Sequence, residues 1–232
     1  SFNGATGDQT ITNASGETFP YLTINKATSG GVTLAGAVTV SNTLTLTKGV
    51  VTTTSSNLLN ITNTSAAAMS GGSSASYVSG PLRWSVSNGS GGDYKFHLGK
   101  SSTYLPLNVN NPTGTSPVIT AEAFVANAAG TAGSGLSSLS TSEYWSVENT
   151  GTLSAATISL AKASIGSNNG IGTSTTLAGT YNNLGGSVTS TLIASNTVTA
   201  VTTVGSLATT NYFVLGVKVA APTITSFTPS SG

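Results

Sequence analysis

The chain contains no cysteine and only one histidine. Without cysteine, neither a disulfide framework nor a thiolate metal site can form. A single histidine cannot complete a usual tetrahedral zinc site, and no Asp-rich loop of the kind that holds calcium is present. We therefore expect no metal-binding residues and no cofactor.

Charge is equally scarce. Charged residues make up 6% of the 232 residues, and the formal net charge is +1, whereas soluble domains usually carry roughly 25% charged residues. The six lysines and one arginine form no basic patch, which argues against nucleic acid as a partner. No apolar run approaches the roughly 20 residues of a membrane span, and no signal peptide opens the chain. We expect no membrane span, and any export signal would lie outside this sequence.

The acidic residues are scattered rather than clustered, which matters because acid–base catalysis needs titratable groups held near one another. The closest two, Glu143 and Glu148, would face opposite sides of a continuous strand. No acidic residue lies between 18 and 61. We therefore predict that the chain is not an enzyme and has no catalytic residues. The acidic residues are Asp8, Glu17, Asp93, Glu122, Glu143 and Glu148.

Two fragments of catalytic motifs are better explained without catalysis. His97 lies in the alternating segment 94–98, and the Gly-x-Ser-x-Gly turn of serine hydrolases is absent from the chain. Ser159 and Lys162 have the Ser-x-x-Lys spacing of penicillin-recognising enzymes, but a chain with 36 serines is expected to contain such a match by chance. Neither fragment predicts a nucleophilic site.

Hydroxyl side chains take the place of charge. The chain has 40 threonines and 36 serines, about a third of its residues, together with 38% hydrophobic residues and a mean hydropathy of +0.17. Disorder requires low hydrophobicity or high net charge, so this chain is expected to fold. Valine, leucine and isoleucine combined with β-branched threonine favour half-buried strands. The composition predicts an all-β fold with almost no helix.

Residues 21–61 repeat an apolar-Thr-apolar triplet, which would place aliphatic side chains on one face of a strand and threonines on the other. Four triplets start six residues apart, at Val32, Val38, Leu44 and Val50. A β-solenoid of stacked parallel strands and an antiparallel meander both fit this pattern, and the regular spacing favours the solenoid. We predict a β-solenoid, similar to a parallel β-helix, over residues 1–80.

Residues 62–80 are rich in Ala, Gly and Ser and mark the best internal boundary. Beyond them, strands of mixed aliphatic and aromatic residues alternate with Gly-, Ser- and Asn-rich turns, which predicts an antiparallel β-sandwich over 81–220. Residues 221–232, with two prolines, are expected to form a linker or the first strand of a following domain. The expected strands are 82–86, 94–98, 105–109, 118–124, 144–147, 156–161, 192–194, 198–204 and 212–219.

Two patterns leave ligand binding open as an alternative. Thr33, Thr39 and Thr45 recur every six residues, and regular threonine rows on a solenoid can present a flat array to ice. Trp84, Trp145 and the tyrosines could bind glycans, although strand aromatics more often belong to the core. The alternative is thus a ligand-binding β-solenoid, for glycan or ice, without catalysis.

Several stretches resemble known protein modules. The triplet region resembles repeats in large surface proteins of the Bacteroidetes, and three later stretches resemble the segment that commonly follows such repeats. The last eleven residues are similar to the opening strand of an immunoglobulin-like IPT/TIG domain. The stretches are 21–26, 31–34, 38–46 and 49–53 for the repeats, 77–82, 96–100 and 104–107 for the following segment, and 222–232 for the IPT/TIG-like strand.

The resemblance implies an extracellular, cell-surface location and export by the type IX secretion system. It also implies a structural or adhesive role, as a stiff stalk segment or as the subunit of a filament. The expected partners are neighbouring copies or adjoining domains of the same surface protein, with glycans or surfaces as further candidates.

Overall fold

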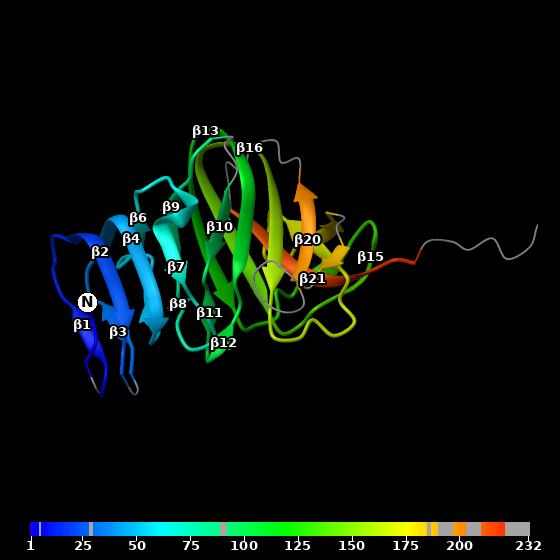
Figure 1. Ribbon diagram of the computed structural model, residues 1–232. Helices are drawn as coiled ribbons and strands as arrows, with labels where there is room; N and C mark the ends of the chain where they lie inside the picture. The colour runs from blue at the N-terminus through cyan, green and yellow to red at the C-terminus, as the bar shows by residue number, and fades with distance from the viewer. Residues whose placement is uncertain are drawn as a thin grey trace, which may run out of the picture.

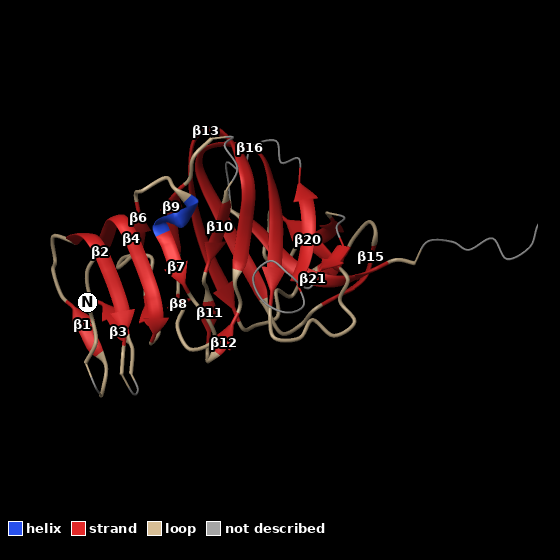
Figure 2. Cartoon of the chain, viewed as in Figure 1, coloured by secondary structure: helices blue, strands red, loops and turns tan. Residues whose placement is uncertain are grey.

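The computed structural model describes residues 1–4, 6–27, 30–88, 92–184, 187–189, 197–202 and 210–220 (Figure 1). Within these residues the only helical segment is one 3-10 turn, Ala66–Ala68, and nearly everything else that is regular is strand (Figure 2). The prediction of an all-β chain with almost no helix is therefore confirmed.

The N-terminal part is a β-solenoid built from two parallel sheets. Every pairing between the solenoid strands is parallel, which excludes the antiparallel meander. One sheet contains β1 (Gln9–Ile11), β3 (Val32–Leu34), β5 (Val51–Thr52) and β8 (Val78–Ser79). The other contains β2 (Glu17–Asn25), β4 (Val38–Lys48), β6 (Leu59–Ile61) and β7 (Met69–Gly71).

The coil of the solenoid is longer than the six-residue spacing of the triplets. Glu17, Val38 and Leu59 are register partners in successive coils, so a coil takes 21 residues at this position of the sheet, whereas the partners Leu44 and Met69 are 25 residues apart. Val38 and Leu44, which start adjacent triplets, lie in the same strand. The six-residue spacing therefore separates neighbouring triplets within one coil. The sequence pattern predicted the solenoid but not the number of residues in each coil.

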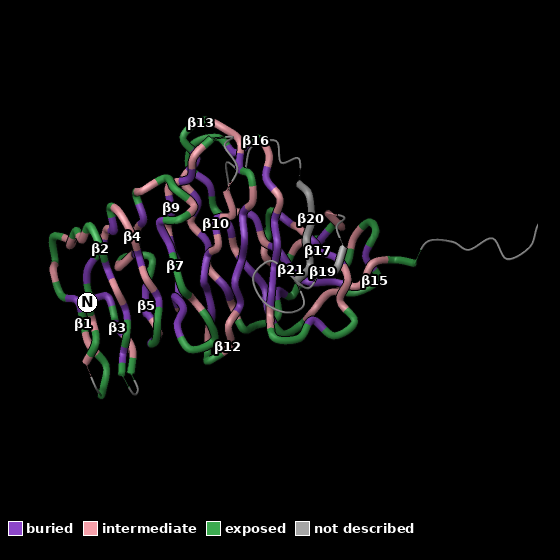
Figure 3. Tube along the Cα trace, in the orientation of Figure 1, coloured by how far each residue is buried: buried purple, intermediate pink, exposed green. Residues whose placement is uncertain are grey.

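Alternation along the strands separates the core from the surface. In β4, Val38, Val40, Leu44 and Leu46 are all buried, because every second side chain of a strand points to the same face (Figure 3). The threonines between these aliphatic residues point outward. This division builds an aliphatic interior with a hydroxyl surface.

The solenoid passes into the sandwich without a break in hydrogen bonding. Strand β9 (Leu82–Ser85) pairs in parallel with β6 and antiparallel with β13 (Leu107–Phe124). One sheet thus runs in the order β2-β4-β6-β9-β13-β16-β21-β17-β18-β14. The remaining strands in this order are β16 (Tyr144–Ala161), β21 (Asn211–Lys218), β17 (Gly170–Ser174), β18 (Thr180–Asn183) and β14 (Thr131–Ala132).

The predicted antiparallel sandwich is built around a long hairpin of β13 and β16. Each of these two strands contributes one half to each layer of the sandwich. The first half of β13 pairs with β10 (Asp93–Phe96), and its second half pairs with β9. Likewise, the first half of β16 pairs with β21, and its second half pairs with β20 (Thr197–Thr202). Trp84 of β9 meets Phe96 of β10 edge-on, with ring centroids 5.4 Å apart, so the two layers face each other across the core.

Shorter strands complete this region. Strands β11 (Gly99–Lys100) and β12 (Thr103–Tyr104) pair with each other, while β15 (Leu136–Leu139) pairs with β21 and β19 (Ser187–Thr189) with β20. Residues 62–80 hold the 3-10 turn, β7 and β8, which belong to the last coil. The strand expected at 192–194 and the segment 221–232 lie outside the described residues.

Candidate functional site

A groove of about 440 Å³ lies on the outer face of the continuous sheet. Strands β9, β13, β16 and β21 each contribute residues to its lining, and these strands are neighbours in the sheet. Ser55 and Leu58 from the solenoid also line it, as do Leu177 and Thr210 from the sandwich. The groove therefore draws on both parts of the molecule.

Strand alternation decides which side chains reach the groove. On β13, the side chain of Ala123 is buried in the core, whereas those of Thr120, Glu122 and Phe124 are partly exposed and line the groove. On β16, the core residues Trp145 and Val147 alternate with groove residues in the same way. The register pairs Thr120 with Glu148, Glu122 with Ser146 and Phe124 with Tyr144.

One end of the groove is aromatic. The rings of Phe124 and Tyr144 stack with centroids 4.4 Å apart and an interplanar angle of 10°. Tyr212 of β21 approaches Tyr144 edge-on at 6.3 Å. Burial, followed by the nearby Tyr212 and Glu122, raises the pKa of Tyr144. Its hydroxyl therefore keeps its proton at neutral pH and can donate a hydrogen bond.

Charged groups occupy the rest of the groove. Burial raises the pKa of Glu122, although the Lys100 ammonium, 3.5 Å from its Oε1, acts in the opposite direction. Glu148 is exposed. The side chain of Arg83, the one arginine of the chain, has no hydrogen-bond or ion-pair partner among the described residues, and its Nε atom is buried. The groove thus combines a free donor with two carboxylates.

Sequence reasoning missed the pairing of Glu122 with Glu148, because the two residues come from separate strands. Their direct partners, Ser146 and Thr120, make them diagonal neighbours on one face, a relation that places Cα atoms about 7–8 Å apart. A prediction that β13 and β16 form a hairpin would have found the pair. Glu143 is separate from this face: it is 2% exposed, and its Oε2 lies 2.5 Å from Nζ of Lys162.

The tryptophans proposed as sugar-binding candidates belong to the core. Trp84 and Trp145 are both fully buried. Their Nε1 atoms donate hydrogen bonds to backbone carbonyls, that of Trp84 to Asn63 and that of Trp145 to Leu105. Neither ring is available to a ligand, so the groove aromatics that can meet one are Phe124 and Tyr212, which are only partly buried.

The histidine is also an interior residue. His97 is 7% exposed, and its Nδ1 atom lies 2.5 Å from the hydroxyl of Tyr104. Burial, assisted by the charge of Lys95, lowers the pKa of His97 to about 4. Ser159 is fully buried, and the ammonium of Lys162 pairs with Glu143.

The threonines of the six-residue pattern do not all share a face. Thr33 lies in the β1-β3-β5-β8 sheet, whereas Thr39 and Thr45 lie in β4 of the other sheet. Stacking across coils does align Thr10, Thr33 and Thr52, which are all exposed. On the other sheet, Thr39 aligns with Thr18 and Thr45 aligns with Thr23. Both sheets therefore carry rows of hydroxyl groups, and ice binding stays a prediction.

Among the described residues, no three His, Cys, Asp or Glu side chains come close enough to hold a metal ion. None of the helical structure described has the length and hydropathy to cross a membrane. No family model, curated protein or solved structure matches this chain. Its function therefore has to be inferred from the fold and the groove.

Proposed function

We propose that the chain is a stiff structural and adhesive module of an extracellular bacterial surface protein, and that it has no catalytic activity. The observation that carries this proposal is the continuous sheet, which runs from β2 at one end of the molecule to β14 at the other. A solenoid needs a neighbour to cover the open end of its last coil. Here the sandwich covers that end and extends the sheet.

Stiffness follows from this continuity. The largest hydrophobic cluster extends from Ile11 in the first coil to Leu215 in β21 without interruption. Bending the molecule between solenoid and sandwich would break the pairing of β6 with β9 and open the close-packed core beneath it. A hinge is thus disfavoured at the position where a two-domain chain would have one.

The elongated arrangement of the described residues also suits a stalk segment. Its N-terminus lies at one end of the long axis, and strand β21 runs toward the other end (Figure 1). Adjoining domains or further copies would then continue the axis in both directions. The hydroxyl surface supports the same role, because a surface with little charge responds weakly to salt and offers few lysines and arginines to trypsin-like proteases.

The stiff-module proposal is tested by urea unfolding with two fluorescent probes. Trp145 reports on the sandwich, and Trp84 reports on its junction with the solenoid. In a Trp84→Phe, Trp145→Phe background, Tyr21→Trp places a probe on the exposed β2 surface of the solenoid. For each protein, we expect the unfolding transition measured by tryptophan fluorescence to coincide with the transition measured by backbone circular dichroism. A solenoid transition separate from that of the sandwich would refute a single stiff unit.

The proposed location has its own test. Antibodies against the purified chain should label intact cells of the producing bacterium, and protease added outside the cells should remove the label. Labelling that appears only after lysis would refute the surface location while leaving the stiffness argument untouched.

A further inference from the structure

We propose that the groove over β9, β13, β16 and β21 binds a neutral oligosaccharide without cleaving it. This inference goes beyond the stalk role and does not depend on it, because it rests on groove residues alone. Binding sites of this size usually combine an apolar lining with a few polar groups that fix orientation. The groove has both.

The aromatic end fits the apolar face of a sugar ring. The stacked pair of Phe124 and Tyr144, with Tyr212 edge-on beside it, places three aromatic rings at one end of the groove. Phe124 and Tyr212 are half-buried rather than fully buried, so both keep accessible surface. The C–H face of a pyranose can cover such a surface while its hydroxyls reach the polar groups around it.

The polar end fits hydroxyl groups. Arg83, Thr120 and Glu148 occupy one row across three strands. The guanidinium of Arg83 lacks a partner among the described residues and can donate to hydroxyl oxygens, while the exposed carboxylate of Glu148 can accept from hydroxyl protons. Only a ligand whose groups both donate and accept satisfies this row.

The mixed charges argue for a neutral ligand. An anionic sugar would meet the carboxylates of Glu122 and Glu148, and a cationic one would meet Arg83 and the ammonium that neutralises Glu122. Phe124 at the aromatic end lies four steps along β13 from Thr120 in the polar row, a distance of about 13 Å at the rise of an extended strand. Since this exceeds one sugar ring, an oligosaccharide is the matching occupant.

The position of the two carboxylates argues against cleavage. Glycosidases place their two carboxyl groups on either side of the scissile bond. Glu122 and Glu148 instead rise from adjacent strands of the groove floor. A sugar lying on that floor would meet both carboxylates from the same side, which suits hydrogen bonding rather than acid–base chemistry.

The test is isothermal titration calorimetry of the full chain with cellohexaose, xylohexaose, mannohexaose and chitohexaose. We expect saturable binding of at least one of these probes. Glu148→Gln should weaken it about tenfold, because hydrogen bonds to charged groups are among the stronger ones. Tyr212→Ala should weaken it by at least as much through the lost ring surface.

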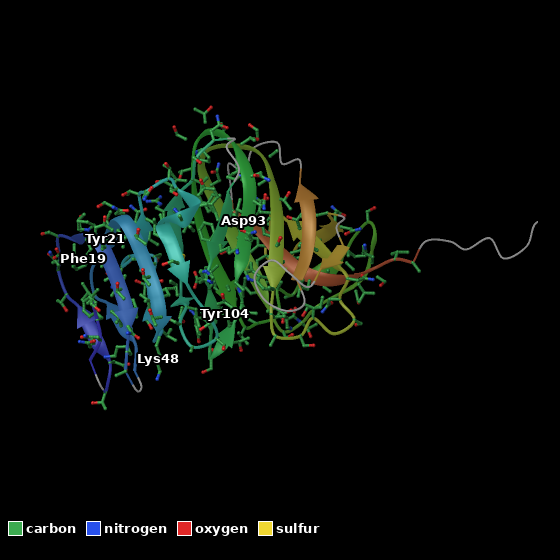
Figure 4. The ribbon with its side chains drawn as sticks, in the orientation of Figure 1. Phe19, Tyr21, Lys48, Asp93 and Tyr104 are labelled. Carbon is green, nitrogen blue, oxygen red and sulfur yellow. The ribbon has the colours of Figure 1, made fainter. Side chains whose placement is uncertain are left out.

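Tyr21→Ala is the matched control, since Tyr21 is 66% exposed on the solenoid, away from β13 and β16 (Figure 4). It should bind like the wild-type chain, and circular dichroism should confirm that every variant is folded. Failure of all four probes to bind, or unchanged affinity in both Glu148→Gln and Tyr212→Ala, would overturn the proposal. Release of shorter sugars would overturn its non-catalytic part, and neither result would alter the unfolding test of the stalk.

Discussion

Nδ1 of His97 lies 2.5 Å from the hydroxyl oxygen of Tyr104, and the two rings are stacked at an angle of 9°. The pair belongs to the junction between solenoid and sandwich. The backbone carbonyl of His97 accepts a hydrogen bond from the amide of Val78 in β8, and Leu98 forms a parallel bridge with the same residue. Both sheets of the solenoid are therefore joined to the sandwich.

Acid should weaken this junction. Burial holds the pKa of His97 at about 4 in the folded chain, below its value of about 6.5 in an unfolded chain. The unfolded state therefore binds the proton first, and stability is fully present above pH 6.5 and falls as the pH drops toward 4. The full loss amounts to about 3 kcal/mol. Urea unfolding at pH 7.5, 5.5 and 4.5 measures it.

His97→Gln is the control for this pH dependence, since glutamine keeps hydrogen-bonding capacity without titrating. Its free energy of unfolding should change less between pH 7.5 and 4.5 than that of the wild-type chain. Glu122 should make the free energy of unfolding change with pH in the opposite direction, because burial raises its pKa. Both proteins contain Glu122, so its contribution cancels when they are compared. Equal pH dependence in the two proteins would contradict the assignment to His97.

Trp84 should be the most sensitive aromatic residue at the same junction. It is fully buried, meets Tyr94 and Phe96 edge-on, and donates from Nε1 to the carbonyl of Asn63 in the solenoid. Trp84→Ala removes a large core side chain, which typically costs about 3–5 kcal/mol. Chemical denaturation followed by circular dichroism provides the measurement. Tyr21→Ala, at an exposed site, should stay within about 0.5 kcal/mol, and a similarly small loss for Trp84→Ala would contradict the packing.

Local alternation carried most of the fold prediction. The aliphatic and threonine triplets around Val38 and Leu44 predicted strands with one buried face, and the structure has them. Such patterns report which face of a strand is buried. They do not report which strands are partners, so the number of residues in a coil could not be predicted from them.

The features that the sequence did not predict depend on pairing between strands that are far apart in the chain. Residues 110–117 contain Asn, Gly, Ser and Pro and looked like a turn between two strands, yet β13 continues through them. Shifts in register absorb the irregular residues, with positive φ values at Asn111, Gly114 and Ser116. The groove depends on this pairing, because only the β13–β16 register places Glu122 and Glu148 on one face.

Removing Lys162 should cost more than removing the whole ion pair. Glu143 is 3% exposed in its side chain and also accepts hydrogen bonds from Ser140 and Ser142. Lys162→Met leaves this buried carboxylate without its counter-ion, a change that costs about 3–5 kcal/mol in comparable pairs. Glu143→Gln combined with Lys162→Met removes both charges and should recover part of the loss. A double-mutant cycle by urea unfolding measures the difference, and strictly additive losses would refute the coupling.

A side chain at Gly72 should destabilise the fold, because Gly72 lies against the ring of His97. Its φ is +77°, and a Cβ atom there would come within 2.1 Å of the ring's Cγ atom. Gly7 is the matched control, with a φ of +74° and no atom within 4 Å of a Cβ. Gly7→Ala should cost about 1–2 kcal/mol from backbone strain alone. Gly72→Ala should cost the same strain energy and, in addition, about 1–3 kcal/mol from overpacking. Thermal and urea unfolding of both variants measure the gap. Equal losses would mean that the His97 ring moves aside freely, which its stacking on Tyr104 argues against.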